Sequence, residues 1–220
     1  GHDRVARDPP CRPVRGHERD GARQPTTSRE TGRQVRALAR ALRGMGVQPG
    51  DRVALVSENR PEWLVADYAI MSAGAITVPA YATNTVEENR HVMANAGTCG
   101  VIVSGKALAA NVVEAAMRSP ACRFVIAIEK PELGQHTGIE VVGWDEALAR
   151  GEARSDDIDA IVAGLRRADT ACIIHTSGTG GLPKGVELHH GAMLRNCDGA
   201  ALGGALPPAY IRSPRVEPKR

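Results

Sequence analysis

The chain has 220 residues, 42% of them hydrophobic and 24% charged, so it can bury one substantial core and does not resemble a disordered polyelectrolyte. Its net charge of +3 comes from the ends, because residues 44–200 hold 13 basic and 19 acidic residues. This balance disfavours a basic nucleic-acid-binding body, and we expect no nucleic-acid partner.

The two ends of the chain differ from its middle. Residues 1–30 mix Arg, Pro, Gly and Asp without a hydrophobic period, and residues 206–220 return to Pro and Arg. We expect both to be disordered or foreign tails around a body at 31–205, and a functional basic arm is the alternative for the first. Because the chain begins at Gly1 without an initiator Met, we expect a fragment.

The cysteines and the apolar residues 64–82 indicate whether the protein has disulfides, a metal site or a membrane span. The five cysteines form no CxxC or metal-ligand spacing, so they predict reduced, mostly buried thiols and no metal site. Residues 64–82 contain Asp67, Gly74 and Pro79, a pattern typical of helix, turn and strand rather than of a membrane span. We expect a cytoplasmic protein.

The first ordered element is an amphipathic helix. Val35, Leu38, Ala39 and Leu42 recur at the spacing of one helical face, and arginines occupy most of the other face. This pattern predicts a helix that begins near residue 31 and ends at the glycines at 44 and 46.

The following segments alternate between strand and helix patterns. Thr85 and Glu88 predict a capping box, and Gly97 predicts the C-terminal stop of the same helix. Strand and helix alternate three times within about eighty residues, which is typical of an α/β fold with a parallel sheet and covering helices. We expect strands at 52–56, 75–78, 100–103, 123–128, 170–174 and 186–188, and helices at 61–73, 85–96, 106–117, 144–150, 157–165 and 191–201.

Several conspicuous side chains have ordinary structural interpretations. Trp63 and Tyr68 share a helix and are expected in the core. His175, at the end of an apolar strand, is expected to be packed or hydrogen-bonded. His189 and His190 are adjacent and have no carboxylate or thiol cluster beside them, so we expect a helix-entry role rather than a metal site.

Residues 175–185 follow an apolar strand and combine three hydroxyls, four glycines and one lysine. Glycines let backbone N–H groups approach an anion, hydroxyls donate directional hydrogen bonds, and lysine adds positive charge. The loop is neither a Walker A motif nor a dinucleotide fingerprint, and a flexible turn between strands is the alternative. We assign nucleotide phosphate binding to Thr176, Ser177, Gly178, Thr179, Gly180, Gly181, Pro183, Lys184 and Gly185.

This loop resembles the signature of the adenylate-forming (AMP-binding) superfamily, aromatic-Thr-Ser-Gly-(Ser/Thr)-(Thr/Gly)-Gly-x-Pro-Lys-Gly-Val, over residues 176–186. His175 stands where the signature has an aromatic residue. Gly180 replaces a hydroxyl residue, as in relatives of the long-chain fatty acyl-CoA synthetases. Residues 46–54, 59–63, 74–79 and 188–192 extend the resemblance to that group.

The resemblance implies the N-terminal part of the family's large domain, with an incomplete, mostly parallel sheet. It also implies acyl activation: a carboxylate attacks the α-phosphate of ATP to give acyl-AMP and pyrophosphate, and coenzyme A then displaces AMP. ATP, Mg²⁺ and coenzyme A are the implied small molecules. The implied substrate is a long-chain fatty acid or another carboxylate, and peripheral contact with the inner face of a membrane fits such a substrate.

The family's later elements are not found in these 220 residues. The catalytic residues, the acidic motif that engages Mg²⁺ and the small C-terminal domain with its adenylating lysine are expected beyond residue 220. We therefore expect the chain alone not to complete the reaction. The alternative to a piece of an active ligase is a non-catalytic remnant that at most binds nucleotide.

Overall fold

The computed structural model of the protein describes residues 13–14, 18–19, 22–23, 26–131, 138–176 and 182–201. Seven strands form its main sheet: β5 (Arg52–Val56), β6 (Ile76–Ala80), β7 (Thr98–Val103), β8 (Phe124–Ala127), β9 (Glu140–Gly143), β10 (Thr170–Thr176) and β11 (Lys184–His189). Their order is β11-β10-β6-β5-β7-β8-β9, and only β10 and β11 pair antiparallel. The predicted mostly parallel α/β sheet is confirmed.

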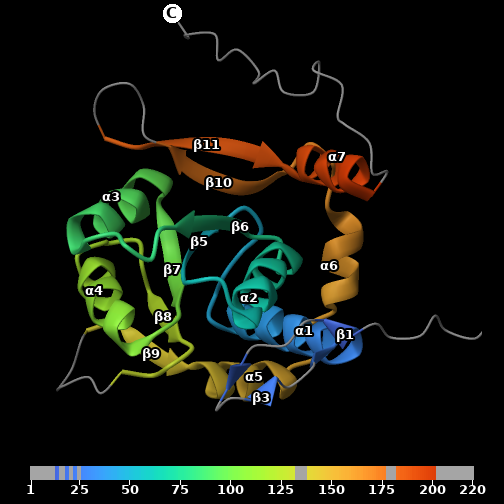
Figure 1. Ribbon diagram of the computed structural model, residues 1–220, viewed down its shortest axis with the longest axis horizontal. Coiled ribbons are helices and arrows are strands. Elements are labelled where there is room, and N and C mark those ends of the chain that lie inside the picture. Colours follow the sequence, from blue (N-terminus) through green and yellow to red (C-terminus); the bar gives the residue numbers. More distant parts are fainter. Residues whose placement is uncertain are drawn as a thin grey trace, which may run out of the picture.

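Helices cover both faces of this sheet. They are α1 (Ser28–Gly44), α2 (Pro61–Ser72), α3 (Val86–Ala96), α4 (Lys106–Met117), α5 (Trp144–Glu152), α6 (Ile158–Gly164) and α7 (His190–Ala201). α3 and α4 lie on one side of the sheet, and α1 and α2 lie on the other (Figure 1). Successive strand residues point to opposite faces, so Leu55 packs toward α1 and α2 while Val56 packs toward α3 and α4.

The first long helix begins at Ser28, three residues before its predicted start. The Thr27 hydroxyl accepts a hydrogen bond from the Glu30 amide at 3.2 Å, which is an N-cap contact. Two pairs of two-residue strands precede it: β1 (Pro13–Val14) with β4 (Thr26–Thr27), and β2 (Glu18–Arg19) with β3 (Ala22–Arg23). Regular structure therefore begins inside the segment that composition alone marks as a tail.

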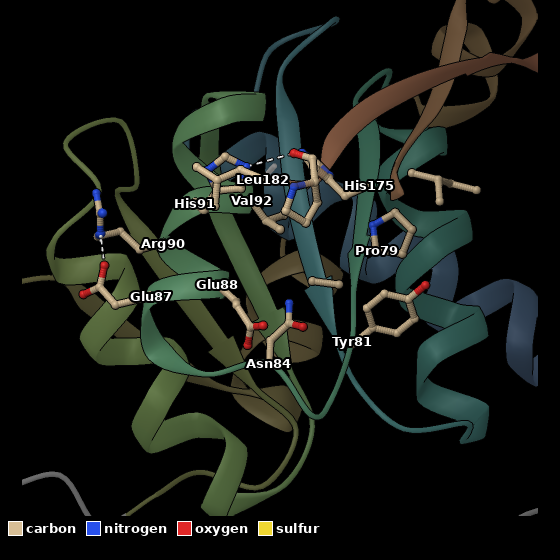
Figure 2. Close-up of a pocket in the computed structure, with 13 residues that line it drawn as sticks. Pro79, Tyr81, Asn84, Glu87, Glu88, Arg90, His91, Val92, His175 and Leu182 are labelled. Atoms are coloured by element: carbon tan, nitrogen blue, oxygen red, sulfur yellow. Dashed lines mark hydrogen bonds and ion pairs between the residues drawn. The ribbon is translucent and has the colours of Figure 1, made fainter. Parts of the chain in front are cut away.

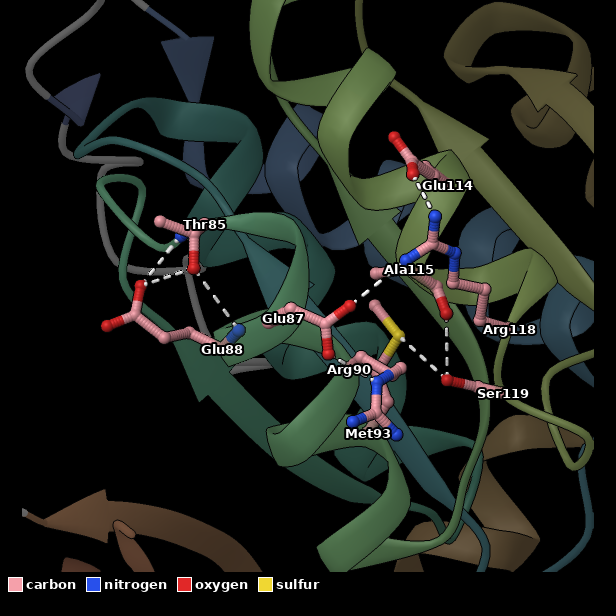
Figure 3. Close-up of polar contacts among 9 residues, drawn as sticks. All are labelled: Thr85, Glu87, Glu88, Arg90, Met93, Glu114, Ala115, Arg118 and Ser119. Atoms are coloured by element: carbon pink, nitrogen blue, oxygen red, sulfur yellow. Dashed lines mark hydrogen bonds and ion pairs between the residues drawn. The ribbon is translucent and has the colours of Figure 1, made fainter.

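The ends of α3 are those the sequence predicts. The Thr85 amide donates to Glu88 Oε2 at 2.7 Å, and the Glu88 amide donates to Thr85 Oγ1 at 3.3 Å, which completes the capping box (Figure 3). Gly97 ends the helix with a φ of 62°, a left-handed conformation that glycine adopts at little cost.

Some details of the fold differ from the sequence predictions. Tyr68 is 48% exposed, because it lies on the side of α2 turned away from the core, whereas Trp63 packs against the core as expected. β9 was not predicted, because its four residues at the edge of the sheet bury a single side chain. β11 begins at Lys184 rather than at residue 186, because pairing with β10 extends it.

Three cysteines can be compared with the sequence prediction. Cys99 and Cys172 are buried, Cys122 is half-buried, and all three are free thiols. Burial raises the pKa of each thiol to about 11, so all three are protonated at neutral pH. Cys11 and the side chain of Cys197 lie outside the described residues. Over the described part of the chain, no helix has the length and apolar character needed to cross a bilayer.

Candidate functional site

The candidate site lies at the edge of the sheet where β6 and β10 end. These strands run parallel and share the pair Cys172 and Thr77, so their carboxyl ends reach the same edge. Residues 81–84 leave β6 there, and the predicted phosphate-binding loop leaves β10 there. In open α/β sheets, ligands bind outside the carboxyl ends of the strands.

The predicted loop is closed by the hairpin of β10 and β11. In this antiparallel pair, His175 lies opposite Gly185, and Thr176 lies opposite Lys184. The last two residues of the predicted loop are therefore strand residues, held by the ladder. Of the nine predicted phosphate ligands, Thr176, Pro183, Lys184 and Gly185 are described, whereas Ser177, Gly178, Thr179, Gly180 and Gly181 lie outside the described residues.

The two faces of β11 have different surroundings. A Cβ atom at Gly185 would lie 2.8 Å from Ile173 Cγ2 and 3.5 Å from both Asn95 Oδ1 and His175 Nε2, so this position faces α3. Side chains alternate along a strand, so Lys184 faces the opposite side. Lys184 is exposed, and within the described ranges its ammonium group has no hydrogen-bond or ion-pair partner. A cation so placed can meet an anion without first breaking an internal contact.

Two side chains of α3 contact the two arms of the hairpin. His91 Nε2 lies 2.9 Å from the carbonyl oxygen of Pro183, and Asn95 Oδ1 lies 3.0 Å from His175 Nε2. The rings of His91 and His175 meet edge to face with centroids 6.5 Å apart. No local pattern in the sequence pointed to His91 or Asn95, because their partners lie 92 and 80 residues further along the chain.

His175 is a buried, hydrogen-bonded histidine, as the sequence predicts. Its residue is only 6% exposed, and burial, followed by the charge of nearby His91, lowers the pKa of its imidazole below the usual 6.5. With Nε2 bonded to Asn95, Nδ1 is buried and has no hydrogen-bond partner among the described residues. The imidazole therefore favours its neutral form in the folded chain.

A cavity of about 490 Å³ lies between α3, the end of β6 and the hairpin (Figure 2). This volume is in the range of small-molecule sites. His91 and His175 lie at one end, and Asn84 and Glu88 lie at the other. Its remaining lining is mostly apolar and comprises Pro79, Ala80, Tyr81, Val92, Ile174, Leu182 and Pro183, with Glu87 and Arg90.

His189 and His190 lie at the entry to a helix, as the sequence predicts. The His189 Nδ1 atom accepts a hydrogen bond from the Ala192 amide at 3.1 Å, and His190 is the first residue of α7, so both lie at the helix entry. No group of three or more His, Cys, Asp or Glu side chains suited to a metal ion occurs in the part of the chain that the structure describes.

A mostly parallel sheet with helices on both faces, in which β10 and β11 form an antiparallel hairpin at one edge, defines the class: open-sheet α/β proteins. Within this class, the chain belongs to the AMP-binding enzyme family, whose model matches residues 3–210. The match is wider than the range 31–205 expected from composition and motifs.

Curated relatives point to acyl-CoA ligases. The chain is 33% identical over 207 residues to the long-chain-fatty-acid–CoA ligase FadD15 of Mycobacterium tuberculosis, which covers 90% of this chain and 33% of that protein. It is 29% identical to the peroxisomal long chain acyl-CoA synthetase 7 of Arabidopsis thaliana, over 83% of this chain and 26% of that protein. The chain thus spans about a third of the length of these relatives or less.

Solved structures of adenylate-forming enzymes share the fold. A benzoate CoA ligase from Burkholderia xenovorans superposes with a TM-score of 0.63 at 25% identity, over 79% of this chain and 31% of that one. The adenylation domain of a carboxylic acid reductase from Segniliparus rugosus gives a TM-score of 0.65 at 18% identity, over 79% of this chain and 30% of that one. The second likeness concerns the fold alone.

Proposed function

We propose that this chain supplies the phosphate-binding loop of an enzyme that activates a long-chain fatty acid with ATP, first as acyl-AMP and then as acyl-CoA. The observation that carries the proposal is the setting of Lys184. This exposed cation, which has no ion-pair partner among the residues that the structure describes, lies at the first position of β11, where the glycine-rich loop meets the ladder. Family membership and the names of the curated relatives support the acyl-CoA ligase reaction.

The role of the loop follows from the charge that the reaction creates. When the carboxylate oxygen bonds to the α-phosphorus, the bond to the bridging oxygen breaks, and negative charge develops on pyrophosphate. Lys184 neutralises this charge, and preorganised donors stabilise it without rearranging. In this proposal the hydroxyls of Thr176, Ser177 and Thr179 donate hydrogen bonds, and so do the backbone amides of Gly178, Gly180 and Gly181, while Pro183 fixes the backbone before Lys184.

The described residues do not fit a resident Mg²⁺ site, because no acidic cluster lies among them. We therefore derive no step through Mg²⁺, which enters the proposal as the counter-ion that ATP brings. Coenzyme A enters as the thiol that takes the acyl group from AMP in the second step. Since the chain spans a third of FadD15, these steps belong to the proposed full reaction.

Removing the lysine ammonium group tests the role of the loop. We expect Lys184→Ala to weaken ATP binding by about 1.5–3 kcal/mol, roughly ten- to a hundred-fold, because a charge-assisted contact is lost. Titration calorimetry with ATP and with pyrophosphate measures this loss. Lys130→Ala is the matched control, because Lys130 is also exposed and pairs with Glu146, away from the hairpin. Equal ATP affinity in the parent and Lys184→Ala would remove the loop from the mechanism.

A second measurement separates the ligase from a remnant that only binds nucleotide. Fatty-acid-dependent exchange of labelled pyrophosphate into ATP requires formation of acyl-AMP. Exchange by this chain above the level of Lys184→Ala would show that it activates a carboxylate. Nucleotide binding without exchange would favour the remnant.

A further inference from the structure

Helix α3 contacts both arms of the phosphate-binding hairpin with two side chains one helical turn apart. His91 reaches the carbonyl oxygen of Pro183, directly before β11, and Asn95 reaches His175, near the end of β10. Residues four apart lie on the same face of a helix. We propose that His91 and Asn95 are positioning residues that form a clamp, the α3 clamp, which holds the two arms in the geometry that places Lys184 for phosphate binding. This inference rests on the proposed function.

The helix that carries the clamp is itself held at several points. The capping box fixes its first turn, and Glu87 forms an ion pair at 3.0 Å with Arg118, directly after α4 (Figure 3). At the same junction the Ser119 hydroxyl donates to the Ala115 carbonyl at 2.9 Å and contacts Met93 Sδ at 3.8 Å. The buried side chains of Val92 and Met93 add packing. These contacts hold α3 in place, so α3 can in turn hold the hairpin.

The clamp lies on the opposite side of the hairpin from the lysine. Gly185 faces His175 and Asn95, whereas Lys184 faces away from α3. The two clamp bonds therefore leave the Lys184 ammonium group unobstructed. His91 acts through the backbone carbonyl of Pro183 and Asn95 through the side chain of His175, and this arrangement makes them positioning residues rather than ligands.

The contact between His91 and Pro183 can be removed or preserved at a single position. The Pro183 oxygen can only accept, so His91 Nε2 is the donor. His91→Leu removes this donor, and His91→Gln keeps an N–H donor at a similar distance from the backbone. Ala94→Gln is the matched control, because Ala94 is an exposed residue of the same helix and is not among the residues that line the cavity.

Two measurements on the full chain test the α3 clamp. The first is amide hydrogen exchange at residues 184–186, which needs no ligand, and the second is calorimetric affinity for inorganic pyrophosphate. With His91→Leu we expect exchange to rise and affinity to fall, each roughly fivefold, as for the loss of a single hydrogen bond. His91→Gln and Ala94→Gln should stay within about twofold of the parent. Asn95→Ala should act in the same direction as His91→Leu.

The outcomes separate the clamp from the proposed function. If His91→Leu leaves both readouts unchanged, or if His91→Gln behaves like His91→Leu, the clamp is overturned. If exchange rises while pyrophosphate affinity does not change, the contact is only structural and the positioning role is overturned. If the parent binds no pyrophosphate and Lys184→Ala behaves identically, the proposed function fails, and exchange still decides whether His91 holds the hairpin.

Discussion

The middle of the sheet and its β10–β11 edge are built in different ways. β7 and β8 are buried at every residue, with helices on both faces, whereas nearly every residue of β11 is exposed. The middle is held by apolar burial. The edge depends on the ladder with β10 and on the hydrogen bonds from α3. Stability and the proposed phosphate binding therefore depend on different parts of the chain, and substitutions should separate them.

The largest expected effect on the free energy of unfolding comes from a substitution in the middle of the sheet. Phe124 is the single phenylalanine of the chain and is fully buried, so Phe124→Ala should lower the free energy of unfolding by about 3–5 kcal/mol. Val186 on β11 is 47% exposed, and Val186→Ala should change it by about 0.5 kcal/mol or less. Urea denaturation of both variants measures the contrast. Similar losses in the two would contradict the division of the sheet into a buried middle and an open edge.

A smaller effect is expected where α1 and α5 meet. A Cβ atom at Gly151 would lie 1.7 Å from the Ala37 carbonyl oxygen, so the two helix backbones approach too closely for any side chain. Gly151→Ala should cost about 1–3 kcal/mol, because the helices must move apart. Gly164→Ala is the control, since no atom lies within 4 Å of a Cβ there. Thermal unfolding that ranks Gly151→Ala no lower than Gly164→Ala would contradict this packing.

The smallest expected effect concerns the edge and is pH-dependent. Burial and the charge of His91 lower the pKa of His175 below 6.5 in the folded chain. As pH falls below the unfolded value, the unfolded chain takes up the proton first, so stability decreases with falling pH until the folded pKa is reached. Above about pH 6.5 this contribution is absent.

His175→Phe removes this titration. We expect the free energy of unfolding of the variant to fall less between about pH 7 and pH 5 than that of the parent. Urea denaturation across this range measures the difference in slope. A variant with the same slope as the parent would show that His175 does not contribute.

Elements with local signals could be predicted from the sequence. The capping box at Thr85 and Glu88 and the glycine at 97 set the ends of α3, and the β-branched runs marked β5 and β7. Tyr68 was misjudged because α2 is apolar around most of its circumference, so its spacing did not reveal the exposed side. The error at Tyr68 concerns tertiary packing rather than local preference.

The candidate site was predictable only in part. The hydroxyl, glycine and lysine pattern pointed to the loop, because phosphate chemistry selects residue types at adjacent positions. The start of β11 at Lys184 and the contact of His91 with Pro183 depend on which distant segments meet, and no adjacent residues signal them.

The absence of a side chain at Gly185 also favours one register of pairing between β11 and β10. Side chains alternate along β11, so a slip of one residue would turn Lys184 toward α3 and remove its charge from the open face. The same slip would place a side chain where only hydrogen now fits, against Ile173 Cγ2. Inserting or deleting one residue in the loop would therefore conflict with the packing at Gly185.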